Sequence, residues 1–140
     1  MAIRVVRLGT ARARDEGQRI GAVRRPPRGV ARADYSRRDY FDVWLPELAP
    51  SAPVVSSAHA GSWTPARWLR FVRLYHREMR VPRGRHLIAT LAALSHQTNF
   101  SVGCYCADET RCHRSLLRGL FLDAGAVVVD GKKPKEARPR

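Results

Sequence analysis

The sequence predicts an α/β fold, a small two-layer or three-layer structure with a mainly parallel sheet and flanking helices. Short segments rich in β-branched residues alternate with longer segments in which apolar residues recur every three or four positions. The chain has 140 residues, of which 44% are hydrophobic and 27% charged, values typical of a globular domain. We therefore expect a single domain over residues 1–130, followed by a basic tail over residues 131–140.

The first third of the chain predicts two strands separated by a polar segment. Residues 3–8 are rich in Val and Ile and predict the first strand. Residues 10–18 are polar and predict a loop, whereas residues 20–23 predict a short second strand. The segment 24–29, Arg-Arg-Pro-Pro-Arg-Gly, contains two consecutive prolines and therefore predicts an arginine-rich loop directly after that strand.

The middle of the chain predicts an interrupted helix followed by a loop. Residues 39–48 place aromatic and aliphatic side chains on one face of a short helix, which Pro46 interrupts. Residues 49–62 contain two prolines and many small residues and therefore predict a segment that is mostly loop.

The clearest predicted helix begins at Thr64 and Pro65, because Thr is a preferred N-cap and Pro is favoured at the first helical position. Apolar residues at three- and four-residue spacing extend this helix until Pro82 and Gly84 end it. The remaining elements are a helix over residues 86–97, a strand over 100–106, a turn over 107–111, a helix over 112–124 ended by Gly125, and a short last strand over 126–130.

The chain is strongly basic, with 26 Lys and Arg residues against 12 Asp and Glu residues and a net charge of +14. Such a charge attracts phosphate, so the expected partners are a phosphate-bearing small molecule or a nucleic acid. The same composition also arises where a GC-rich bacterial genome favours arginine codons. No apolar run of about 18 residues predicts a membrane span, and the first residues do not resemble a secretory signal. We expect a cytoplasmic protein without a membrane partner, and the oligomeric state is left open.

Three cysteines, Cys104, Cys106 and Cys112, lie within nine residues of one another. An odd number of cysteines in a chain of this kind argues against a disulfide framework. Their clustering instead indicates metal or thiol chemistry. In a parallel sheet, ligands bind beyond the carboxyl ends of the strands, and both this cluster and the arginine-rich loop follow predicted strands.

Two interpretations of this cluster involve the sulfur atoms directly. Cys104 and Cys106 share one face of a strand, and with Cys112 and His113 they form a possible zinc site, although their spacing differs from that of standard zinc fingers. No other cofactor is predicted. Alternatively, Cys112 at a helix N-terminus is a stabilised thiolate and acts as a nucleophile, with His113 or His59 as the base.

The third interpretation is an anion site at the start of the last helix. Helix N-terminal amides together with Arg114 and Ser115 can hold a phosphate group. Arg24, Arg25 and Arg28, in the loop after the second strand, are expected to approach from the neighbouring strand end. A fourth alternative is purely structural, because buried cysteines also serve as small hydrophobic residues.

Several motifs resemble domain-of-unknown-function family 488, which includes the YeaO-like bacterial proteins. The run Cys-His-Arg-Ser-Leu-Leu at residues 112–117, after a strand that ends in Cys and an acidic turn, is similar to the C-terminal signature of that family. The resemblance covers residues 3–129 and includes further matching pieces at Arg24, Pro27-Arg28-Gly29, Trp44-Leu45, Ala49-Pro50-Ser51, His59, Phe71, Tyr75 and Glu78.

The chain departs from the pattern of this family at two positions, since Val23 stands where the family has Asp and Pro26 where it has Trp. The resemblance implies an α/β fold and names no reaction. Our principal expectation is therefore a cytoplasmic member of an uncharacterised family with an anion or phosphate site and thiol-dependent catalysis. The alternatives are a nucleic-acid-binding protein without enzymatic activity and a zinc-stabilised adaptor.

Overall fold

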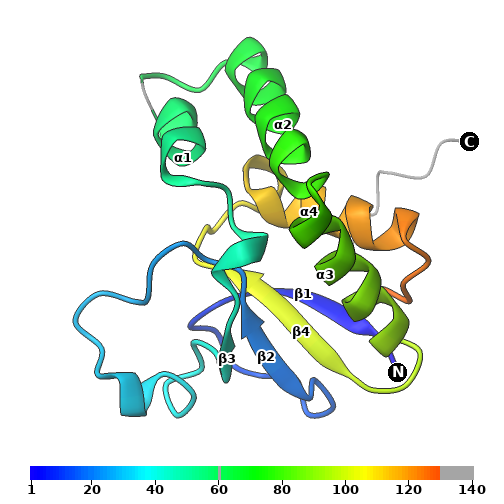
Figure 1. Cartoon of the computed structure of the whole chain (residues 1–140). Coiled ribbons are helices and arrows are strands. Elements are labelled where there is room, and N and C mark those ends of the chain that lie inside the picture. Colours follow the sequence, from blue (N-terminus) through cyan, green and yellow to red (C-terminus); the bar gives the residue numbers. More distant parts are fainter. Residues whose placement is uncertain (60, 130–140) are drawn as a thin grey trace, which may run out of the picture.

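The computed structural model describes residues 1–59 and 61–129 and contains a four-stranded, all-parallel sheet (Figure 1). Its strands lie in the order β1-β4-β2-β3. This arrangement confirms the predicted α/β fold class and its mainly parallel sheet. The strands are β1 (Ile3–Arg7), β2 (Gln18–Gly21), β3 (Val43–Trp44) and β4 (Phe100–Cys104).

Helices pack on one face of the sheet and close the main hydrophobic core (Figure 1). Four helices are present in the described chain, namely α1 (Ala52–His59), α2 (Pro65–Met79), α3 (Pro82–Leu94) and α4 (His113–Asp123). Ile20 of β2 and Val102 of β4 are buried in the same cluster as Tyr75 of α2 and Phe121 of α4. Because β4 lies between two strands, the turn that follows it emerges near the middle of the carboxyl edge of the sheet.

Loops rather than helices cover the opposite face, so the domain has a single helical layer. Gly21 of β2 and Gly103 of β4 lie on this face, where a Cβ would come within 2.5 Å of Phe41 and within 2.6 Å of Leu8, respectively. The two glycines therefore allow the segments that carry Phe41 and Leu8 to lie directly against the sheet.

A buried ion pair completes this face. The guanidinium of Arg19, which is fully buried, donates through Nε and Nη2 to the two carboxylate oxygens of Glu16 at 2.7 and 2.9 Å. Ser101 of β4 donates to Glu16 at 2.6 Å. Burial raises the pKa of Glu16, but the hydrogen bonds from Arg19 and Ser101 outweigh it and keep that pKa below its ordinary value.

Two sequence predictions in the middle of the chain are wrong. Residues 39–48 form the two-residue strand β3 and a 3-10 turn over Pro46–Leu48 instead of an interrupted helix. Residues 49–62 were expected to be mostly loop because of their prolines and small residues, but they include helix α1. Pro53 is the second residue of this helix, where the missing N–H costs nothing because first-turn amides have no partner within the helix.

The helix after α2 also begins earlier than predicted, at Pro82 instead of residue 86. Gly84 does not end a helix but lies within α3, where a Cβ would come within 2.7 Å of the carbonyl oxygen of Met79. The predicted start of α2 is confirmed, because Thr64 Oγ1 accepts a hydrogen bond from the amide of Arg67 at 3.1 Å. Gly125 has the left-handed conformation, with φ 84°, directly after α4.

The last strand predicted over residues 126–130 is reduced to one parallel bridge between Ile3 and Val128. Residues 130–140 lie outside the described residues, and with them the predicted basic tail. None of the described helices has both the length and the apolar character needed to cross a bilayer.

Candidate functional site

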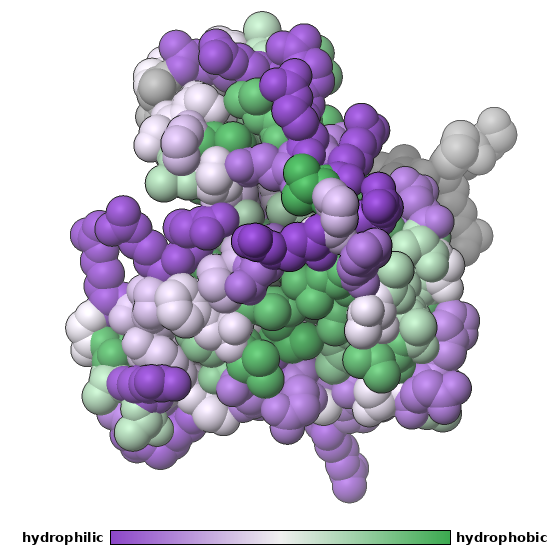
Figure 2. All heavy atoms as spheres, in the orientation of Figure 1, coloured by the Kyte–Doolittle hydropathy of each residue, from purple (hydrophilic) through white to green (hydrophobic). Residues whose placement is uncertain are grey.

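A pocket of about 830 Å³ lies at the carboxyl ends of β2 and β4. Its walls come from the loop after β2, helix α1, the first turns of α2 and the turn between β4 and α4. The surface is indented below α1 in Figure 2, where hydrophilic residues of the loop after β2 form the lower margin. Both segments that the sequence selected as strand-end loops therefore contribute to one pocket.

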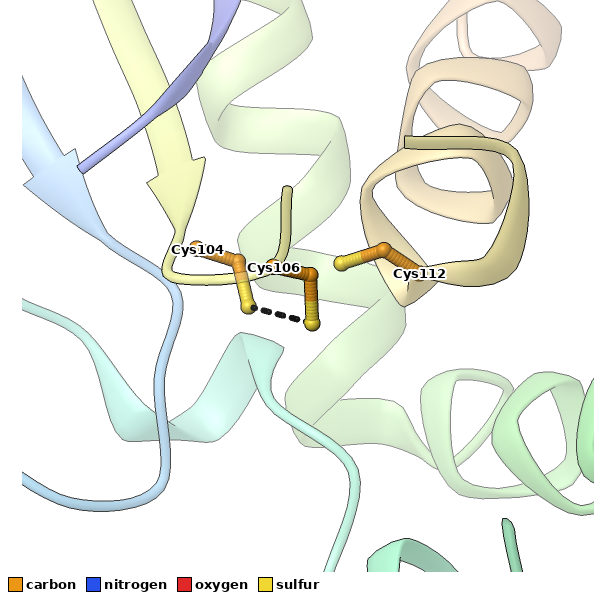
Figure 3. A group of neighbouring side chains, drawn as sticks. All are labelled: Cys104, Cys106 and Cys112. Atoms are coloured by element: carbon orange, nitrogen blue, oxygen red, sulfur yellow. Dashed lines mark hydrogen bonds between the residues drawn. The ribbon is translucent and has the colours of Figure 1, made fainter. Parts of the chain in front are cut away.

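The three cysteines converge at the inner end of this pocket (Figure 3). Cys104 is the last residue of β4, Cys106 follows in the turn, and Cys112 is the N-cap residue of α4. The Cys112 side chain extends from the start of α4 toward the other two sulfur atoms. The Sγ atoms of Cys104 and Cys106 are 3.8 Å apart, and all three lie within 4.8 Å of one another.

The three thiols differ in exposure and in acidity. Cys104 and Cys112 are buried, whereas Cys106 is partly exposed to the pocket. Hydrogen bonds from the Cys104 and Cys112 thiols, with the positive charge of Arg114, lower the pKa of Cys106 against the effect of its partial burial. The hydrogen bonds to Cys106 and Cys112, followed by burial, raise the pKa of Cys104 far above its ordinary value. Cys106 is therefore the most acidic thiol of the cluster.

His113, the first residue of α4, connects this cluster to β2. Its Nε2 lies 2.7 Å from the carbonyl oxygen of Ala22, and its Nδ1 lies 3.8 Å from Sγ of Cys112. Because a carbonyl oxygen only accepts, we assign the proton of the neutral ring to Nε2. Nδ1 then carries a free lone pair and accepts a hydrogen bond from the Cys112 thiol.

Arginines surround the outer part of the pocket. Arg24 is already engaged, since its guanidinium donates to the carbonyl oxygens of Pro50 and Ala49 at 3.2 and 3.1 Å. The guanidinium groups of Arg25 and Arg28 are exposed, and among the described residues no side-chain hydrogen bond or ion pair holds them. They are consequently available to an anionic ligand.

Aromatic rings form much of the remaining wall. Arg111 lies over the ring of Trp63, with its guanidinium carbon 4.1 Å from the ring centroid. Such flat rings and stacked guanidinium groups suit a planar ligand. The other aromatic residues that line the pocket are Tyr40, Trp68, Phe71 and Tyr105.

The structure brings most of the predicted site residues together. Arg24, Arg28, Cys112 and His113 all line the pocket, as do Cys104 and Cys106. Of His59, only the backbone is described, as the last residue of α1, and its side chain lies outside the described part of the chain.

Two predicted anion ligands point elsewhere. Arg114 is buried behind the turn, where its Nη2 donates to the carbonyl oxygen of Cys106 at 2.5 Å. Ser115 donates through Oγ to the carbonyl oxygen of Cys112 at 2.9 Å. Neither side chain lines the pocket, because helical geometry turns these two positions away from it.

Arg25, which was expected to approach the anion site, also lines the pocket, as does Arg111 from the turn between β4 and α4. Both lie in the two segments that the sequence selected as strand-end loops, whereas sequence reasoning missed Arg67, which lines the pocket too. Arg67 had no such signal, because its place depends on the way α1 and α2 enclose the pocket.

No match was found to a curated protein or to a solved structure. A family model matches residues 3–125, and it is DUF488-N3a, described as the active DUF488-N3 subclade. The matched range includes the four strands, the four helices and every pocket residue described above. The chain therefore belongs to domain-of-unknown-function family 488, in the DUF488-N3a subclade.

Proposed function

We propose that the protein binds a phosphate-bearing ligand in this pocket and acts on it through a cysteine thiolate. The observation that carries the proposal is the position of the three thiols at the inner end of a pocket whose margin holds Arg25 and Arg28. A guanidinium group recognises phosphate oxygens through paired hydrogen bonds. The aromatic walls favour a ligand that also contains a planar ring, such as a nucleotide.

Each residue has a distinct role in this proposal. Arg25 and Arg28 hold the phosphate group, and the N-terminus of α4 adds its positive dipole at Cys112. Cys106 is the reactive sulfur, because it is the partly exposed thiol and its pKa is lowered. Cys112 lies between Cys106 and Nδ1 of His113 and thereby connects the reactive sulfur to the imidazole ring.

The test is alkylation of metal-free protein by iodoacetamide at pH 6, followed by peptide mass spectrometry. We expect Cys106 to react first and several-fold faster than an unperturbed thiol, since an ordinary cysteine is largely protonated at this pH. Inorganic phosphate or AMP is expected to slow the reaction several-fold. Equal reactivity at all three cysteines, without protection by either anion, would contradict the proposal.

Matched variants assign the protection to the arginines. In the double variant Arg25→Gln, Arg28→Gln, phosphate and AMP are expected to lose their protective effect while Cys106 remains reactive. The control is Arg85→Gln, which removes one exposed arginine of α3 away from the pocket. Protection that persists in the double variant at the wild-type level would show that these arginines do not hold the anion.

A further inference from the structure

We infer that Cys104, Cys106 and Cys112 form a binding site for a zinc ion, with a fourth coordination position open to the pocket. This inference goes beyond the proposed function, because it concerns a zinc-bound form in which Cys106 and Cys112 are metal ligands. The thiolate reaction of Cys106 belongs to the metal-free form, and the arginines that would bind phosphate are separate residues in both forms. The chemistry of the donor set is the first argument: three thiol groups within 4.8 Å of one another form a soft site that suits Zn²⁺.

The distances agree with tetrahedral coordination. Two sulfur ligands at the usual zinc–sulfur distance of about 2.3 Å are separated by about 3.8 Å when the angle between them is tetrahedral. The Sγ atoms of Cys104 and Cys106 are 3.8 Å apart. Cys112 lies within 4.8 Å of both, so a small rotation of its side chain completes the third edge.

The charges around the site provide a second and independent argument. Arg114 is 4% exposed, and its Nε is a buried polar atom without a hydrogen-bond partner in the described structure. Its Nη2 donates to the carbonyl oxygen of Cys106, so this guanidinium lies beside the cluster. A zinc ion with three thiolates carries a net charge of −1, which would place a counter-charge beside this buried arginine.

No side chain in the described part of the chain fills the fourth position. Among the described residues, no additional His, Cys, Asp or Glu offers a ligand atom within 4.8 Å of all three sulfur atoms. His113 is held by its hydrogen bond to Ala22 and contacts only the Cys112 sulfur of the cluster. Three protein ligands with one open position are typical of catalytic zinc, whereas structural zinc has four.

The open position faces the pocket, since all three cysteines line it. A water molecule or a phosphate oxygen of the ligand can occupy it. In the zinc-bound form the three sulfur atoms are ligands, so Cys106 is shielded from alkylation. Zinc binding requires thiolate ligands, so it releases protons and weakens as the pH falls.

The test is elemental analysis of protein purified without a metal-chelating tag, followed by replacement of zinc with Co²⁺. We expect about one zinc per chain and, with cobalt, strong sulfur-to-metal charge-transfer absorption in the near ultraviolet with the visible bands of tetrahedral cobalt. A protein that binds neither ion, or binds cobalt without charge-transfer bands, would overturn the inference. Formation of a disulfide within the cluster in freshly purified, air-protected protein would also overturn it.

Two variants distinguish three sulfur ligands from other arrangements. Cys106→Ser changes a partly exposed residue, so the protein is expected to fold, as circular dichroism will verify, and to lose the charge-transfer band. His113→Asn is expected to retain it, because His113 is not a ligand. Retention of full cobalt binding by Cys106→Ser would contradict the inference. Loss of the charge-transfer band in folded His113→Asn protein would contradict it too.

The same cobalt spectrum separates this inference from the proposed function. The double variant Arg25→Gln, Arg28→Gln is expected to keep the cobalt spectrum and to lose phosphate binding. In wild-type protein, phosphate is expected to shift the visible cobalt bands, since it reaches the open position. A normal cobalt spectrum that phosphate does not change would support coordination by three sulfur atoms. The same result would contradict the open fourth position and the phosphate pocket.

Discussion

One carboxylate holds the loop layer against the sheet. Asp42 accepts hydrogen bonds from the amide of Arg19 and from Nη1 of Arg12, both at 2.7 Å, and a further bond from Ser36. Partial burial raises the pKa of Asp42, but these hydrogen bonds outweigh it and lower the pKa from 3.8 to about 2. The same segment brings Tyr40 to the pocket wall, so this carboxylate also supports the site.

Replacing Asp42 by Asn should reduce the free energy of unfolding at pH 7 by about 1–2 kcal/mol, because charge-assisted hydrogen bonds are lost. A carboxyl whose pKa is lowered on folding stabilises the protein above its unfolded pKa, and this contribution disappears as the pH falls through the folded pKa. The difference between wild type and Asp42→Asn should therefore shrink between pH 4 and pH 2. Urea unfolding at several pH values measures it, and a constant difference over this range would contradict the explanation.

At the level of single residues, sequence reasoning identified which residue types belong to the site better than it identified the directions in which their side chains point. It selected Cys112, His113 and Arg24, which all line the pocket. It also selected Arg114 and Ser115, whose side chains turn toward backbone carbonyls, since their orientation depends on the rotation of α4 about its axis. Such a rotation is set by tertiary packing and leaves no local signal.

Among the secondary-structure elements, α2 has the greatest importance for the pocket wall. Its buried stripe continues from Trp68 through stacked rings at Phe71 and Tyr75, whose hydroxyl donates to the carbonyl oxygen of Leu48 at 2.8 Å. Trp68 and Phe71 also line the pocket. The start of this helix therefore controls the position of the aromatic wall.

Removing the N-cap of α2 tests this dependence. Thr64→Ala should lower the free energy of unfolding by about 1 kcal/mol, because the amide of Arg67 loses its side-chain acceptor. Thr90→Ala is the control, since Thr90 is an exposed residue within α3 and Ala is a better helix former there. Thermal unfolding measures both, and an equal loss in the two variants would show that capping is not the cause.

Helix α1 shows where rules of local secondary-structure prediction fail. Prolines at positions 50 and 53 and many small residues predict a loop, yet Ala52–His59 is helical. Proline is compatible with the first helical turn, and packing against α2 supplies the stabilisation that the short sequence lacks. By contrast, α2 has an N-cap and a regular apolar stripe, and both of its ends were predicted well.

For the whole molecule, the alternation of apolar segments predicted the α/β class and the parallel sheet. The loop layer was not predicted, because it depends on charged residues that sequence rules place at the surface. Arg19 is fully buried and pairs with Glu16, which also accepts a hydrogen bond from Ser101. Glu16 and Ser101 are 85 residues apart in the sequence and meet only after folding. The pocket is likewise formed by four separate segments of the chain, so its shape could not be predicted from local sequence patterns.

The central claim is that this assembled pocket binds a phosphate group through Arg25 and Arg28. Titration of the protein with AMP and with adenosine at constant ionic strength tests it most directly, followed by tryptophan fluorescence, to which Trp63 and Trp68 of the pocket contribute. We predict saturable binding of AMP, at least tenfold weaker binding of adenosine, loss of this preference in Arg25→Gln, Arg28→Gln and no change in Arg85→Gln. Equal affinity for AMP and adenosine in the wild-type protein would contradict the account.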